Sequence, residues 1–123
     1  LMNEILGDDL GVSKEHKFKP AIEVYELEDG YTVEVALAGL TKEDVAIEID
    51  GEHLKISGER RKSEKTDGDK LHLSEFRYGK FERKLQLPKN ADHSKIDASL
   101  DNGVLKLSIL KKEEFKPKQI EIK

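Results

Sequence analysis

The alternation of apolar and polar residues between residues 20 and 110 constrains this chain more than any other feature. In residues 31–37 every second residue is apolar, and the residues between them are Thr, Glu and Ala. A period of two places successive side chains on opposite faces of a strand, whereas an amphipathic helix needs a period near 3.6. The sequence therefore predicts strands that each have one buried and one solvated face.

Short turn dipeptides separate these runs. Asp29-Gly30, Asp50-Gly51 and Asn102-Gly103 are typical of β-hairpins, and Pro88 ends a run because it cannot donate to a ladder. Residues 41–44 suit a single capped turn. The expected strands lie near 22–27, 31–37, 45–49, 54–57, 71–76, 81–87, 96–100 and 104–110. About eight strands with almost no helix predict an all-β fold, an immunoglobulin-like antiparallel β-sandwich. We expect its core to contain Val33, Val35, Ile47, Ile56, Leu85, Leu105 and Leu107.

Composition divides the chain into three zones. Residues 1–19 form an N-terminal arm in which Gly7 and Gly11 allow one or two helical turns at most. Residues 20–110 form the sandwich domain, and residues 111–123 form a charged C-terminal extension. We expect both arms to be flexible. Because the chain opens with Leu1 and not with Met, we expect the N-terminal arm to be truncated or processed.

Charge and residue usage exclude several classes of function. The chain has 22 Lys and Arg against 26 Asp and Glu, so the net charge of -4 argues against nucleic acid as a partner. The lack of cysteine excludes disulfides, iron–sulfur clusters and thiol catalysis. No apolar run approaches the roughly 18 residues of a membrane span, and no signal-peptide pattern opens the chain. These features predict a cytoplasmic protein without a membrane partner.

Catalytic motifs are missing from the sequence. Ser57-Gly58 lacks the glycine spacing of a nucleophile elbow, and Asp67-Gly68-Asp69 lacks the remaining ligands of a calcium loop. No glycine-rich phosphate loop is present. The four histidines are too far apart for a metal-binding motif: His16, His53, His72 and His93. We therefore predict a protein that is not an enzyme and that needs no cofactor or metal.

The C-terminal extension carries a candidate interaction motif. Ile120 and Ile122 flank Glu121, so an extended backbone places both isoleucines on one face. Pro117 disfavours a helix before them, and the charged residues 111–118 keep the approach solvated. This pattern favours a segment that docks on a sheet edge or groove. In the alternative interpretation, residues 119–122 are the last strand of the chain's own sandwich.

A second candidate interaction region is the stretch of residues 60–70 with the short apolar patch that follows it. The highly charged stretch 60–70 leads to Leu71 and Leu73, which could pair outside their own sheet. The alternative is an ordinary hairpin loop. Arg83 falls among the apolar positions of its strand, where a charge is expected to be paired within the fold or across an interface.

These residues carry a resemblance to a known family. Ala98, Gly103, Val104 and Leu105 match the A-x-x-x-n-G-v-L signature of the alpha-crystallin domain. Residues 37–45 resemble L-P-G-v-x-x-e-d-i, residues 54–60 resemble L-x-I-x-g-e-R, and residues 75–88 resemble E-R-x-x-G-x-F-x-R-x-x-x-L-P. The chain resembles a small heat-shock protein over residues 20–123. It departs from the pattern at Ala38, where the family has Pro, and at Phe76, where the family has Arg.

The resemblance implies an ATP-independent molecular chaperone, a holdase that binds unfolding client proteins and prevents their aggregation under heat or other stress. It implies a dimer formed by strand exchange, with an interface made by Leu71, Leu73, Glu75, Phe76 and Arg83. It also implies larger homo-oligomers in which Ile120 and Ile122 dock into a neighbour's groove lined by Val45, Ile47, Ile49, Ala98 and Leu100. The alternatives are a scaffold of the related CS-domain type and, less favoured without Trp, a carbohydrate-binding sandwich.

Overall fold

The computed structural model describes residues 18–62 and 68–123, and these form seven strands and two short 3-10 turns. Each strand coincides with a run of alternating apolar residues. The bounds are β1 (Ile22–Glu26), β2 (Gly30–Ala36), β3 (Val45–Asp50), β4 (His53–Arg60), β5 (Gly79–Gln86), β6 (Ala91–Asp101) and β7 (Val104–Lys111), with η2 (Lys42–Asp44) and η3 (Glu113–Phe115) as the turns.

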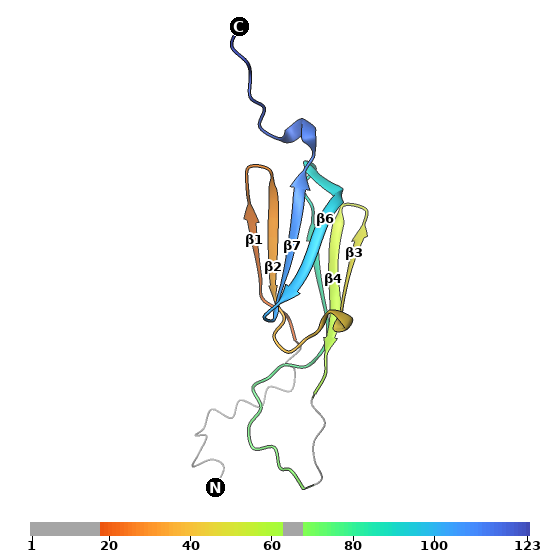
Figure 1. Cartoon of the computed structure of the whole chain (residues 1–123). Helices are drawn as coiled ribbons and strands as arrows, with labels where there is room; N and C mark the ends of the chain where they lie inside the picture. Colours follow the sequence, from red (N-terminus) through yellow and green to blue (C-terminus); the bar gives the residue numbers. More distant parts are fainter. Residues whose placement is uncertain (1–17, 63–67) are drawn as a thin grey trace.

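The strands make two antiparallel sheets that pack face to face (Figure 1). One sheet has the order β1-β2-β7-β6, and the other has the order β3-β4-β5. Tight hairpins join β1 to β2, β3 to β4 and β6 to β7, where the expected turn dipeptides lie. The predicted antiparallel β-sandwich is confirmed.

The core lies between the sheets and consists of the inward rows of alternating residues. Val33, Val35, Ile56, Leu105 and Leu107 are buried as predicted. Two expected core residues, Ile47 on β3 and Leu85 on β5, are only partly buried. Both strands are edges of the three-stranded sheet, so their inward side chains are covered from fewer directions.

The core extends to Phe18, within the stretch predicted as the N-terminal arm. Phe18 is 7% exposed, and its ring meets the Phe81 ring edge-on, with 5.2 Å between the ring centroids. The Arg60 guanidinium also lies over the Phe18 ring, 3.9 Å from the ring centroid, and donates a hydrogen bond to the Ala38 carbonyl. Phe18 therefore closes one end of the sandwich.

We expect Phe18→Ala to lower the free energy of unfolding by about 3 kcal/mol, because it opens a cavity beside Phe81 and removes the ring under Arg60. Chemical denaturation measures this change. Phe115→Ala is the matched control, since Phe115 is 51% exposed and its removal should cost less than about 0.5 kcal/mol. Equal losses in the two variants would contradict a core role for Phe18.

One predicted strand is not formed. The sequence pattern of residues 71–76 predicts a strand, yet these residues pair with no strand among the described residues. They leave the sandwich in a long excursion between β4 and β5 (Figure 1). A strand formed by residues 71–76 would need a free sheet edge to pair with. The described part of the single chain has no such edge beside these residues.

The C-terminal extension also lies apart from the sandwich. After η3 the chain runs away from both sheets, and residues 117–123 join neither of them (Figure 1). The alternative in which residues 119–122 complete the chain's own sandwich is therefore wrong. Within residues 18–62 and 68–123, no helix is long and apolar enough to cross a bilayer.

Candidate functional site

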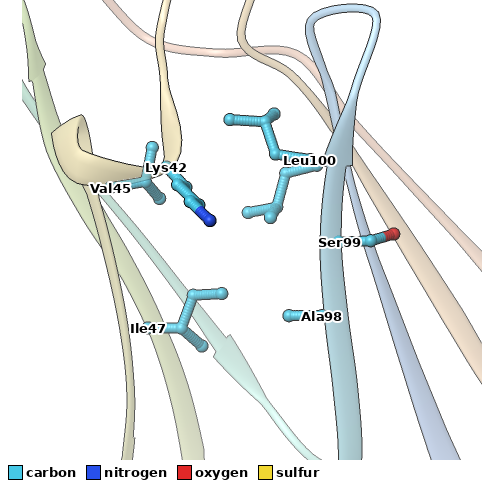
Figure 2. A pocket seen from close by; sticks show the side chains of 7 residues that line it. Lys42, Val45, Ile47, Ala98, Ser99 and Leu100 are labelled. Atoms are coloured by element: carbon cyan, nitrogen blue, oxygen red, sulfur yellow. The ribbon is translucent and has the colours of Figure 1, made fainter.

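An apolar groove runs between the edge strands β3 and β6, where the two sheets leave one side of the sandwich open. Its volume is about 370 Å³. Val45 and Ile47 of β3 face Ala98 and Leu100 of β6 across the opening, whereas the Ser99 hydroxyl points away from it (Figure 2). The lining residues are Lys42, Val45, Ile47, Ala98, Ser99, Leu100 and Leu105.

Four of the five residues predicted for this groove line it, namely Val45, Ile47, Ala98 and Leu100. Ile49 does not: it is on the inward face of β3 but lies beyond the hollow, with 39% of its surface exposed. Leu105 lines the groove from β7, and the groove prediction missed it. The signal was present, because an Asn-Gly hairpin places Leu105 directly opposite Leu100.

A capped turn positions the start of β3. The Asp44 carboxylate accepts hydrogen bonds from the Thr41 backbone N–H at 2.9 Å and from the Thr41 hydroxyl at 3.1 Å. These bonds, the backbone one above all, lower the pKa of Asp44 below its usual value because they stabilise the charged carboxylate. A side chain at Gly58 would collide with the Asp44 carbonyl oxygen, so this glycine lets the turn pack on β4. The turn brings Lys42 into the lining of the groove.

The alpha-crystallin signature residues build the hairpin at the same end. Asn102 and Gly103 have φ angles of 52° and 77°, as a two-residue turn of this kind requires. A Cβ at Gly103 would lie 3.0 Å from the Ala38 Cα, so glycine also permits a close approach. Leu105 is 4% exposed, whereas Val104 faces outward and is 38% exposed. Within the signature, Gly103 therefore forms the hairpin turn and Leu105 forms part of one wall of the groove.

The predicted docking tail is fully presented to solvent. Ile120 is 87% exposed and Ile122 is 94% exposed, the two highest values among the large apolar residues of the described chain. Lys116 pairs with Glu113 at 2.9 Å, which ties the base of the extension to η3. Beyond it, nothing in the described chain covers either isoleucine.

The opposite side of the sandwich, between β1 and β5, is also open. Val24 pairs with the buried Val33 and shares its inward face, yet it is 55% exposed. Arg83 faces inward beside Ile56, is half-buried, and forms no ion pair within residues 18–62 and 68–123. The other residues predicted for the dimer interface are exposed: Leu71, Leu73, Glu75 and Phe76.

The chemistry of these surfaces suits apolar packing. The described residues contain no group of three or more His, Asp or Glu side chains able to hold a metal ion. The groove offers apolar side chains and one cation, and the tail offers two apolar side chains around one carboxylate.

Comparison with known proteins agrees with the resemblance seen in the sequence. Residues 23–123 match the model of the Hsp20/alpha crystallin family. Small heat shock protein C2 from Rickettsia felis is 34% identical over 121 residues, which cover 98% of this chain and 79% of that protein. The chain spans 62% and 63% of the length of two further relatives.

Two solved structures share the fold. Heat shock protein 16.0 from Schizosaccharomyces pombe is 40% identical, with a TM-score of 0.71 over 87% of this chain and 100% of that chain. A small heat-shock protein from Xylella fastidiosa that forms a distinct high order structure is 29% identical, with a TM-score of 0.74 over 87% of this chain and 98% of that one. The chain thus belongs to the Hsp20/alpha crystallin family of small heat shock proteins, a family of proteins that are generally chaperones and not enzymes.

Proposed function

We propose that this protein is an ATP-independent holdase that binds unfolding proteins through apolar surface and prevents their aggregation. The observation that carries the proposal is the pair of unfilled apolar surfaces, the β3–β6 groove and the tail with its exposed isoleucines. Exposed apolar surface of this kind marks a site of interaction, and it would suit the apolar segments that unfolding proteins expose. We place this activity in the cytoplasm, as the composition suggests.

The groove, the tail and the exposed β1 edge would also serve self-assembly. Residues 71–76 of one protomer would add a strand to the exposed β1 edge of its partner. The open side there supports this arrangement, because Val24 is exposed and Arg83 forms no ion pair in the part of the chain that the structure describes. The tail of one dimer would dock in the groove of another, where Ile120 and Ile122 meet Val45, Ile47 and Leu100. The relative from Xylella fastidiosa, which forms a high order structure, lends support.

The energetics suit a reversible chaperone. Burying both tail isoleucines contributes about 3–6 kcal/mol before the cost of ordering the tail. Contacts of this size open and close readily, so each opening would expose a groove for a client. Charged residues make up 39% of the chain, and those on the surface would keep the client complex in solution.

A turbidity assay tests the holdase activity. Two unrelated heat-labile proteins are warmed with and without an equal number of subunits of this protein, without nucleotide. We expect aggregation of both clients to fall several-fold, because hydrophobic association persists on mild heating. Added ATP should change nothing. Unchanged aggregation of both clients would reject the holdase and favour a scaffold for one dedicated partner.

A further inference from the structure

Lys42 is the one charged residue in the lining of the β3–β6 groove. Its ammonium group points into the opening between Ile47 and Leu100 (Figure 2). Within the described part of the chain, Lys42 forms no ion pair and no side-chain hydrogen bond. Lys42 is exposed, so a segment that filled the groove would run beside this cation and would gain from a carboxylate within its reach.

The proposed occupant carries one carboxylate at the right place. Between Lys116 and Lys123 the only acidic residue is Glu121, and it lies between the two isoleucines. When both isoleucines of an extended segment point into the groove, Glu121 points the other way, towards the mouth. The four-carbon side chain of Lys42 can bend outward to that mouth while its methylene groups stay against the apolar wall.

We propose that Lys42 and Glu121 of a second copy form an intermolecular ion pair that sets the register of the docked tail; this inference rests on the tail docking proposed above. A slip of two residues keeps the alternation but puts Gln119 or Lys123 where Glu121 would be. The register with Gln119 at that place loses the ion pair. The register with Lys123 at that place brings a second lysine against Lys42. The pair therefore selects one register by attraction and rejects the others by loss or repulsion.

A peptide-binding experiment tests the ion pair. The receptor is the full chain carrying Ile120→Ala and Ile122→Ala, so that its own tail leaves the groove free. The probe is a fluorescent peptide of residues 116–123, and its binding is followed by anisotropy at low salt. We expect the peptide with Glu121→Lys to bind about fivefold more weakly, which is the size of an exposed ion pair.

Charge reversal on the receptor should restore the binding of that peptide. With Lys42→Glu in the receptor, the Glu121→Lys peptide should regain the lost fivefold, whereas the natural peptide should lose it. Lys89→Glu is the matched control, because Lys89 is exposed in the connection between β5 and β6 and does not line the groove. Molar salt should erase these differences, since it screens a pair at the groove mouth.

The outcomes separate the ion pair from docking itself. If the natural and Glu121→Lys peptides bind equally while a peptide without the isoleucines fails to bind, the ion pair is overturned and docking stands. If the natural peptide fails to bind, or if the peptide without isoleucines binds as well, both proposals fall. Circular dichroism on each receptor confirms that it is folded.

Discussion

Replacing Ile120 and Ile122 with Ala should reduce the native assembly to dimers while the sandwich stays folded. Both side chains are exposed in the single chain, so their removal costs the fold almost nothing. In the assembly the same change removes most of the roughly 3–6 kcal/mol that each docked tail contributes, or more than a hundredfold in association. Multi-angle light scattering measures the mass, and circular dichroism measures the β-signal.

A matched variant controls for the loss of exposed apolar surface in general. Leu27 and Leu110 are 50% and 36% exposed and lie outside the groove and the tail, so their replacement by Ala should leave the mass unchanged. An unchanged mass in the isoleucine variant would reject intermolecular docking. A lost β-signal in that variant would mean that the tail belongs to the fold.

A second large effect is expected when residues 61–76 are replaced by Asn-Gly, which should yield a folded monomer. Arg60 already pairs with Gly79, so the new loop joins two strands that lie side by side. Asn-Gly followed by Arg77 and Tyr78 gives a four-residue connection, a common length for hairpins. The buried residues of the core all lie outside the deletion. Sedimentation equilibrium measures the mass, and thermal unfolding measures the stability.

A gentler variant distinguishes lost backbone pairing from lost side-chain packing. Replacing Leu71, Leu73 and Phe76 with Ser keeps the length of the segment but removes its exposed apolar side chains. The three residues are 57%, 45% and 72% exposed. We expect this variant to weaken the dimer without abolishing it, because the main-chain hydrogen bonds of an added strand remain. A dimer that survives the full deletion would show that strand exchange does not occur in this protein.

Much of the fold was predictable because the sequence encodes it locally. Alternation along each strand assigns every side chain to a face, and the Asp-Gly and Asn-Gly turns assign the hairpins. These two signals are short-range, so they place Val33, Val35 and Leu107 in the core without knowledge of the sheet order. The exposure of the tail was predictable for a similar reason, since the sequence around Ile120 and Ile122 offers them no local apolar partner.

The alternation and the turn dipeptides do not determine how the two sheets are arranged. Alternation says which way a side chain faces, but it does not say which strands become edges or which edges meet. Only the packing of β3 against β6 brings Lys42 and Leu105 to one groove, from positions 63 residues apart. In the same way, only the packed structure places Phe18 in the core, where its ring covers one end of the sandwich. Residues 71–76 stay unpaired because a strand needs an edge, and the edge that suits them belongs to another protomer in the dimer we propose.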